Sequence, residues 1–282
     1  MTPFVAPPAP AVQHLAGRKG AARIALIPPP VLAALNEGLL PTVNLNEFLA
    51  LDLPRLATAV AAHVGLDHKA ERLVDTLAML PAFAPMRRHA HVARALYDLA
   101  ADHPARDAVA HALATHPSDV ARCWAAQWVA FSGLPLADQL QAVTRFAADP
   151  HFGVREIAWM AVRDAIATDV SVAIDLLAGW VHDEDPNLRR FASEATRPRG
   201  VWCAQIEALK REPWEGLPLL EPLRADPSRY VQNSVANWLN DAAKTQPEWV
   251  VAVCERWARE NAGESTRYIV RRAQRSLQGR AD

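Results

Sequence analysis

The segment DPSRYVQNSVANWLND, residues 226–241, carries the pattern that decides the fold. Its apolar residues Val231, Val235, Trp238 and Leu239 recur at steps of three and four, which predicts an amphipathic helix. The Asp-Pro pair at its start is typical of a helix N-terminus. Proline fits the first helical turn, and the aspartate accepts hydrogen bonds from the exposed amides there.

Three more segments begin in a similar way, two with Asp-Pro and one with His-Pro. They are HPSDVARCWAAQWV from His116, DPHFGVREIAWMAV from Asp149 and DPNLRRFASEA from Asp185. A second helical pattern follows each start, at residues 136–147, 170–181, 201–210 and 247–261. A helix pair that recurs every 30 to 45 residues or so is the signature of an α-solenoid. We therefore predict an all-α fold, a HEAT-like α-solenoid of paired antiparallel helices with a concave groove.

The N-terminal half is less regular but also helical. Further helices are expected at residues 54–63, 68–80, 86–101 and 105–114, after a short helix that ends at Gly38. The first residues are rich in proline and alanine, which is typical of a loose chain end. We expect a flexible N-terminal arm over residues 1–24 and a single repeat domain over residues 25–282.

Composition excludes several classes of protein. Lys and Arg number 30 against 31 Asp and Glu, so overall charge gives no argument for nucleic acid. The cysteines Cys123, Cys203 and Cys254 stand far apart and are expected to be reduced in a cytoplasmic protein. No apolar run approaches membrane-spanning length, and we expect no membrane partner.

The helix of residues 226–241 has a second, polar face. Tyr230, Ser234, Asn237 and Asp241 follow one another at helical spacing, whereas a solvated face normally carries Lys, Glu and Arg. The equivalent helices add polar stripes that should converge on one groove: Arg155, Glu156, Trp159 and Arg163, and then Arg189, Arg190, Glu194, Arg197 and Arg199. Such arginines suit a phosphate backbone. The alternative is that each arginine pairs with an aspartate of a neighbouring repeat.

Two long runs carry a family resemblance. RRFASEATRPRGVWC (residues 189–203) and YVQNSVANWLNDAAKTQPEWV (residues 230–250) are similar to runs in the HEAT-like-repeat DNA alkylation-repair glycosylases, the AlkC and AlkD families. The chain looks closer to AlkC, and TRYIVRRAQRSL (residues 266–277) is similar to the family's last helix. The resemblance is strong from about residue 183 to 277 and weaker elsewhere.

The resemblance implies a bacterial, cytoplasmic and nucleoid-associated monomer that excises N3- or N7-alkylated purines from duplex DNA, with no metal and no other cofactor. Asp241 matches the family's catalytic aspartate, and Glu194 matches a second acidic position. The family's acidic residue on the preceding repeat should fall at position 159, where this chain has Trp159. Glu156, one turn earlier on the same helix face, is the candidate substitute.

The predicted site follows from the stripes and the resemblance together. The catalytic candidates are Asp241, Glu194 and Glu156, and the candidates for contact with the substrate are Trp159, Trp202 and Asn237. Contact with the DNA backbone is assigned to Arg163, Arg190, Arg197, Arg199, Lys244 and Arg271. The alternative function is a non-catalytic HEAT-like scaffold that binds DNA or a protein partner.

Overall fold

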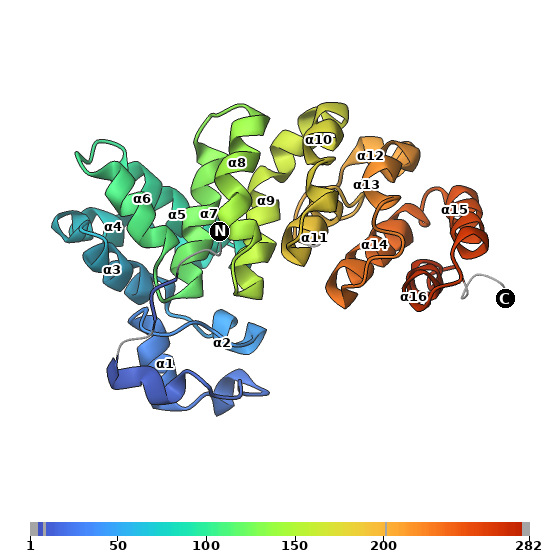
Figure 1. Ribbon diagram of the computed structural model, residues 1–282. Coiled ribbons are helices and arrows are strands. Elements are labelled where there is room, and N and C mark those ends of the chain that lie inside the picture. Colours follow the sequence, from blue (N-terminus) through green and yellow to red (C-terminus); the bar gives the residue numbers. More distant parts are fainter. Residues whose placement is uncertain (1–4, 8–9, 201, 278–282) are drawn as a thin grey trace. The chain divides into compact units, whose positions relative to one another are not determined.

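The computed structural model describes residues 5–7, 10–200 and 202–277, and within these ranges it is helical without β-strands (Figure 1). This confirms the all-α prediction. The contacts divide the chain into two compact units. Unit 1 comprises Met1–Gly133 and Asp149–Ala161, and unit 2 comprises Leu134–Ala148 and Val162–Asp282.

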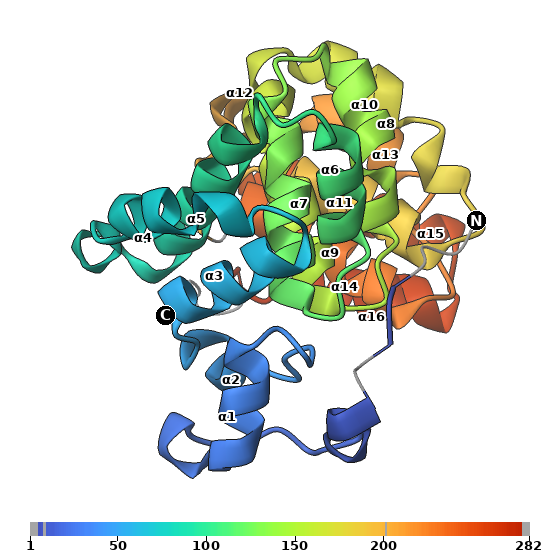
Figure 2. The same ribbon diagram turned by 90° about the vertical axis from the view of Figure 1, so that its left-hand side faces the viewer.

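Unit 1 holds the N-terminal helices, several of them joined by short 3-10 helices (η). They are η1 (Pro10–Leu15), η2 (Ile24–Leu26), α1 (Pro29–Asn36), α2 (Leu45–Leu49), α3 (Leu53–His63), η3 (Asp67–Lys69), α4 (Ala70–Leu77), η4 (Leu80–Ala82), α5 (Pro85–Ala100), α6 (Arg106–Ala114), α7 (Asp119–Phe131) and the start of α9 (Phe152–Thr168). Helices α3, α4 and α5 contact one another, and α5 and α6 both pack on α7 (Figure 2). Gly38, which adopts a φ of 70°, follows the C-cap of α1 and ends that helix as predicted.

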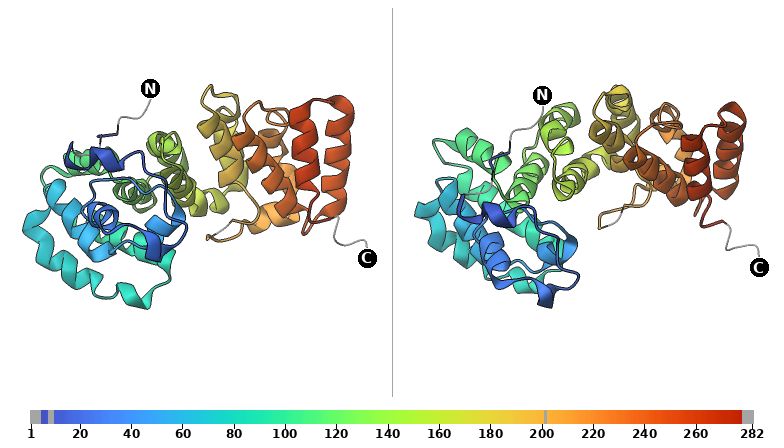
Figure 3. Two further views of the ribbon diagram at one scale, coloured as in Figure 1. Left: turned by 90° about the horizontal axis from the view of Figure 1, so that it is seen from below. Right: turned by 60° about the horizontal axis from the view of Figure 1, so that its bottom comes forward.

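Unit 2 holds the remaining elements. They are α8 (Leu136–Ala147), the end of α9, α10 (Val170–Leu177), η5 (Trp180–His182), α11 (Pro186–Ala195), α12 (Glu207–Arg211), η6 (Pro213–Gly216), α13 (Leu217–Leu220), α14 (Arg229–Ala242), α15 (Pro247–Glu260) and α16 (Glu264–Ala273). Helix α14 lies between α11 and α16 and packs against both, and α15 pairs with α16 (Figure 3). Trp238 of α14 and Trp257 of α15 have no exposed surface, so large aromatic rings fill this interior.

The Asp-Pro helix starts form as the sequence predicts. Asp149, Asp185 and Asp226 each accept a hydrogen bond from the amide two residues further on, at 2.7, 2.8 and 2.8 Å. These bonds satisfy amides that have no partner within the helix. Helices α9, α11 and α14 therefore begin just after the predicted positions.

Two of these aspartates also join successive repeats. The guanidinium of Arg122 on α7 binds Asp149 through two nitrogens, at 2.9 and 3.2 Å. Arg189 on α11 binds Asp226 in the same way, at 2.7 and 3.1 Å. For Arg122 and Arg189, the structure shows the pairing between neighbouring repeats that the sequence analysis left as the alternative. Arg189 thus holds the stack together.

The prediction of a helix over residues 201–210 is wrong for most of that range. Residue 201 lies outside the described part of the chain, and α12 begins only at Glu207. The intervening chain is held by a hydrogen bond from the amide of Ile206 to the carbonyl of Pro198 and by contacts with Arg163. Long-range bonds therefore override the local helical pattern here.

The N-terminal residues are tied to the body by several hydrogen bonds, of which those of Arg18 form an ion pair. The guanidinium of Arg18 donates to both carboxylate oxygens of Glu47, at 3.0 and 2.6 Å, and to the carbonyl of Pro41 at 2.7 Å. Glu47 is buried, so this ion pair fixes the chain before α1 to the start of α2. The boundaries expected at residues 24 and 25 stay a prediction.

Candidate active site

One guanidinium bridges two buried carboxylates in unit 2. Arg197 donates from Nε and Nη2 to Oδ2 of Asp241, at 2.9 and 2.7 Å, and from Nη1 to Oε1 of Glu194 at 2.6 Å. Glu194 and Asp241 are 3% and 4% exposed. The two acids lie far apart in the sequence and meet because α11 packs along α14. The arrangement is a compact anion–cation–anion group.

Glu194 is held as a carboxylate by several donors. Ser234 of α14 donates its hydroxyl proton to Oε2 at 2.7 Å, and Ser193 donates in turn to Ser234 at 2.8 Å. Nη2 of Arg190 lies 3.6 Å from the same Glu194 oxygen. Burial by itself raises the pKa of Glu194, but Arg190, Arg197 and the Ser234 hydrogen bond outweigh it and leave the pKa below its ordinary value. Glu194 is therefore negatively charged at neutral pH.

Asp241 has its second oxygen at the edge of the cluster. Oδ1 accepts from Nζ of Lys244 at 3.2 Å, and the Lys244 side chain is 43% exposed. Ser234 and Asp241 are seven residues apart on α14, two helical turns, so both lie on the polar face predicted from the sequence. Asn237, half-buried between them, accepts a hydrogen bond from Nη2 of Arg275 at 2.9 Å. Asp241 is thus covered by exposed cationic side chains on its outer side.

Arg163 requires a correction. It is 1% exposed and donates to the carbonyls of Ala204, Ala195 and Arg197, at 2.8, 2.9 and 2.6 Å. A guanidinium so enclosed has no surface for a phosphate. Burial lowers its pKa below the ordinary value, although nearby carboxylates oppose this. We revise the predicted backbone contact and assign Arg163 to holding the chain that carries Arg197.

Arg190 is also packed inside unit 2 and has a structural role. It is 8% exposed, its guanidinium lies 4.3 Å from the ring centre of Tyr230, and it approaches Glu194 as described above. A cation over an aromatic face is attracted by the ring's quadrupole, which places negative potential over the face. The predicted role in contacting DNA is revised for Arg190 as well, because the packed guanidinium supports Glu194 from within the stack.

The chain after α11 presents an exposed aromatic side chain. Trp202 is 74% exposed and adopts a φ of 67°, a conformation that non-glycine residues rarely take. Nearby, a side chain at Gly200 would meet the Cys203 sulfur and lie 3.1 Å from Nε of Arg163, so glycine permits the close approach. Arg199, in the same segment, is half-buried, and its Nε lacks a hydrogen-bond partner among the described residues.

Glu156 and Trp159 belong to unit 1. Both lie on α9, where Nε1 of Trp159 donates to Oε2 of Glu156 at 2.9 Å. Trp159 is 2% exposed, so it packs in the interior. The predicted contact of Trp159 with a substrate is therefore revised to a packing role, and its indole orients the Glu156 carboxylate.

The remaining predicted residues, Lys244 and Arg271, are both exposed. The Arg271 guanidinium lies 5.9 Å from the ring centre of Tyr268. Arg275, which lies one turn after Arg271 and bonds Asn237, was not among the predicted residues. The four-residue spacing from Arg271 was the available signal.

As for metals, the part of the chain that is described contains no group of three His, Cys, Asp or Glu side chains that could hold an ion.

The cluster is suited to one kind of chemistry. Two fixed carboxylates in a poorly hydrated setting attract a cation more strongly than they would in water. Arg197 satisfies that attraction within the chain itself. A positively charged ligand would compete for the same oxygens, and a phosphate would compete for the guanidinium.

Membrane insertion finds no support in the helices. Within the described ranges, none combines the length and the apolar character that crossing a bilayer requires.

Comparisons with known proteins agree with the resemblance. The family model for DNA alkylation repair enzymes matches residues 88–277. The chain is 39% identical over 122 residues to the uncharacterized protein YhaZ of Bacillus subtilis (strain 168), covering 43% of this chain and 34% of that protein. A solved structure of the Pseudomonas fluorescens alkylpurine DNA glycosylase AlkC, bound to DNA containing an abasic site analog, matches with a TM-score of 0.63 and 26% identity.

The match to the AlkC structure covers 80% of this chain and 64% of that one, so the chain spans less than two thirds of either relative. The family model alone covers more than half of the chain and includes α11, α14 and α16, which carry the cluster. The chain belongs to the family of DNA alkylation repair enzymes.

Proposed function

We propose that the protein is a DNA glycosylase that removes N3- or N7-alkylated purines from duplex DNA. Its family and its likeness to a DNA-bound alkylpurine glycosylase support this activity. The observation that carries the proposal within the chain is the pair Glu194 and Asp241, two buried acids joined by one arginine and flanked by exposed cations. The proposal calls on no cofactor. The monomeric state and the cytoplasmic, nucleoid-associated location are parts of the same proposal.

The reaction is a hydrolysis of the N-glycosidic bond. An alkylated purine is cationic, and the bonding electrons pass to the base, which leaves as a neutral alkylpurine. Positive charge develops on the deoxyribose, and water then bonds to its anomeric carbon and releases a proton. A carboxylate close to the sugar stabilises this transition state more than the ground state.

Asp241 is the carboxylate assigned to the sugar. At about 4 Å and an effective dielectric constant near 20, attraction between unit charges amounts to roughly 4 kcal/mol. Expressed only in the transition state, that corresponds to about a thousandfold in rate. Glu194 has the supporting role: it holds Arg197, and through Ser234 it is fixed to the helix that carries Asp241.

Arg197 has to change partners for this chemistry. In the structure it occupies Oδ2 of Asp241. We assign a DNA phosphate as the partner that replaces Asp241. A phosphate accepts a guanidinium in the same forked geometry as a carboxylate. Binding of the phosphate releases Asp241 towards the sugar cation. Lys244, Arg271 and Arg199 supply further backbone contacts, with Trp202 and Asn237 beside the damaged nucleotide.

A second candidate function is the non-catalytic scaffold. The observation that favours it is the same bridge, because a carboxylate paired to arginine within the stack is also what a purely structural ion pair looks like. The two candidates differ in one property: a scaffold binds DNA and leaves the glycosidic bond intact.

Base release decides between them. Duplex DNA containing N7-methylguanine is incubated with an excess of purified protein, and free base is measured by chromatography over time. The enzyme releases base well above the buffer rate, and the same duplex without the lesion gives none. Saturated binding, verified by anisotropy, with release at the buffer rate would establish the scaffold instead.

A further inference from the structure

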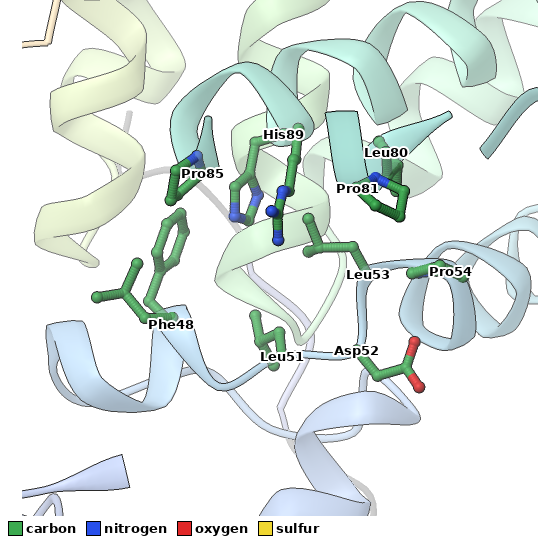
Figure 4. Close-up of a pocket in the computed structure, with 11 residues that line it drawn as sticks. Phe48, Leu51, Asp52, Leu53, Pro54, Leu80, Pro81, Pro85 and His89 are labelled. Atoms are coloured by element: carbon green, nitrogen blue, oxygen red, sulfur yellow. The ribbon is translucent and has the colours of Figure 1, made fainter. Parts of the chain in front are cut away.

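Unit 1 contains a cavity that the proposed chemistry does not use. It has a volume of about 440 Å³ and lies where α2, the start of α3 and the start of α5 meet (Figure 4). This volume is within the range of pockets that hold small organic molecules. Its wall includes aromatic, aliphatic and proline side chains together with one cation, Arg88, and one imidazole, His89.

A stacked pair of rings forms part of the apolar wall. The rings of Phe48 and His89 stack with centroids 4.2 Å apart and planes inclined by 14°. Figure 4 shows this pair beside Pro85, with Leu51 below it and Leu53 to its right. Aromatic and proline rings have few rotatable bonds, so such a wall loses little freedom when a planar group packs against it.

His89 is a polar group left without a partner. It is 4% exposed, and its Nδ1 is buried and makes no hydrogen bond to any described residue. Burial lowers the pKa of His89 to about 3, so the ring is neutral at physiological pH. Buried polar atoms nearly always have partners, and an unpaired one is destabilising. The Nδ1 atom is closed off from the cavity, so His89 contributes a neutral ring to the cavity wall rather than a hydrogen bond.

Arg88 supplies positive charge to the same cavity. Its Nε donates to the carbonyl of Phe83 at 2.8 Å, which fixes the side chain, while its two terminal nitrogens have no partner among the described residues. Arg88 lies in the first turn of α5, a sixteen-residue helix whose N-terminus adds to the positive potential. Asp52, on the opposite wall, is engaged as the cap of α3, where it accepts from the amide of Arg55.

We propose that this cavity binds a small planar aromatic molecule that carries an anionic group. The ring packs against the wall of Phe48, Leu51 and Leu53, and the anion pairs with Arg88. Two kinds of molecule have this chemistry, a nucleoside monophosphate and an aromatic carboxylate. The inference is independent of the glycosylase proposal, because it concerns residues that the reaction does not use.

Titration calorimetry with two probes tests the proposal. Deoxyadenosine monophosphate represents the nucleotides and 2-naphthoate represents the aromatic carboxylates, with deoxyadenosine and 2-naphthamide as their uncharged counterparts. We expect one of the anions to bind the wild-type protein with a Kd on the order of 10 to 100 μM. The anion that binds more tightly shows which of the two classes, nucleotide or aromatic carboxylate, the cavity prefers. Its uncharged counterpart should bind at least about tenfold more weakly.

Variants localise the binding. Arg88→Gln should raise the Kd of the anion by about tenfold or more, because a charge-assisted contact is lost. Arg88→Lys keeps the positive charge and should raise the Kd less. Arg87→Gln, the exposed neighbour on α5, is the matched control and should leave the Kd unchanged.

Leu51→Trp fills the cavity without touching Arg88 and should abolish binding, with circular dichroism confirming the fold of each variant. The proposal is overturned if neither anion binds at about 1 mM. It is equally overturned if Arg87→Gln and Arg88→Gln weaken binding to the same extent, or if the uncharged probes bind as tightly as the anions.

Discussion

The protein contains two kinds of buried arginine–carboxylate contact, and they differ in how completely the arginine is engaged. In unit 1, Arg122 gives two nitrogens to Asp149 and its third to the carbonyls of His116 and Pro117, at 2.7 and 3.0 Å. In unit 2, Arg197 gives all three nitrogens to the carboxylates of Glu194 and Asp241 and none to the backbone.

The difference separates a structural pair from a candidate site. Arg122 is anchored to main-chain oxygens, and Asp149 also caps its own helix, so neither partner can leave without breaking a repeat junction. Arg197 shares one charge between two acids, and the Arg197 side chain is 12% exposed. A guanidinium without backbone anchors can exchange one carboxylate for a phosphate. The following predictions test that distinction.

The largest effect is expected from breaking the closed pair. Asp149→Ala leaves Arg122 buried and uncompensated, and it should lower the free energy of unfolding by about 3 to 5 kcal/mol. Urea unfolding followed by tryptophan fluorescence measures this. Asp98→Ala, which removes one partner of the exposed Arg94–Asp98 pair, is the control and should change stability by less than about 1 kcal/mol. If Asp149→Ala and Asp98→Ala lowered the unfolding free energy equally, the Arg122–Asp149 pair would not have the structural role assigned to it.

Removing the bridging guanidinium should have a smaller effect on stability and a clear one on DNA binding. Arg197→Met leaves Glu194 and Asp241 with Arg190 and Lys244 still nearby, and we expect a loss of about 2 kcal/mol. If Arg197 moves to a phosphate, the slope of log Kobs against log salt should fall by about one unit. An unchanged slope would show that Arg197 stays within the stack when DNA binds.

Acid should remove the contribution of Glu194. Because the folded protein holds the pKa of Glu194 below its ordinary value of 4.5, its ionised form stabilises the fold above the unfolded pKa. That stability is lost as pH falls through the folded pKa. The difference in unfolding free energy between wild type and Glu194→Gln should therefore shrink below about pH 4.5. A difference that stays constant from neutral to acid pH would contradict the charged bridge. Glu248→Gln, at an exposed position, is the control and should show no such change with pH.

The smallest effect is expected at the edge of the cluster. Lys244 is 43% exposed, and Lys244→Met should change the unfolding free energy by less than about 0.5 kcal/mol. It should weaken DNA binding modestly at low salt and hardly at high salt, because exposed charges are screened. A loss of stability comparable to that of Arg197→Met would place Lys244 within the framework.

The repeated helix starts made most of the fold predictable. An aspartate followed by proline is a local signal, and α9, α11 and α14 begin at Phe152, Pro186 and Arg229, at or shortly after these pairs. The segment from residue 198 to 206 was not predictable in this way. Its path depends on Arg163, which comes from α9 and bonds the carbonyl of the last residue of α11 and two carbonyls beyond it.

The candidate site was predictable in its acids and less so in its arginines. Asp241 and Ser234 share a face of α14 by helical spacing alone, and pairing with α11 brings Glu194 to them. Whether an arginine faces solvent or the interior depends on its neighbours from other helices. Arg163, Arg190 and Arg189 are engaged inside unit 2 for that reason, and Arg275 was missed because its partner Asn237 lies on a different helix.

The most direct test of the account compares base release by wild type and Asp241→Asn under single-turnover conditions, on duplex DNA containing N7-methylguanine. The substitution keeps the size of the side chain and removes its charge, and binding is measured in parallel. We expect the variant to bind DNA and to release base roughly a thousandfold more slowly, since about 4 kcal/mol of charge stabilisation is lost. Release within about threefold of the wild-type rate would contradict the role of Asp241.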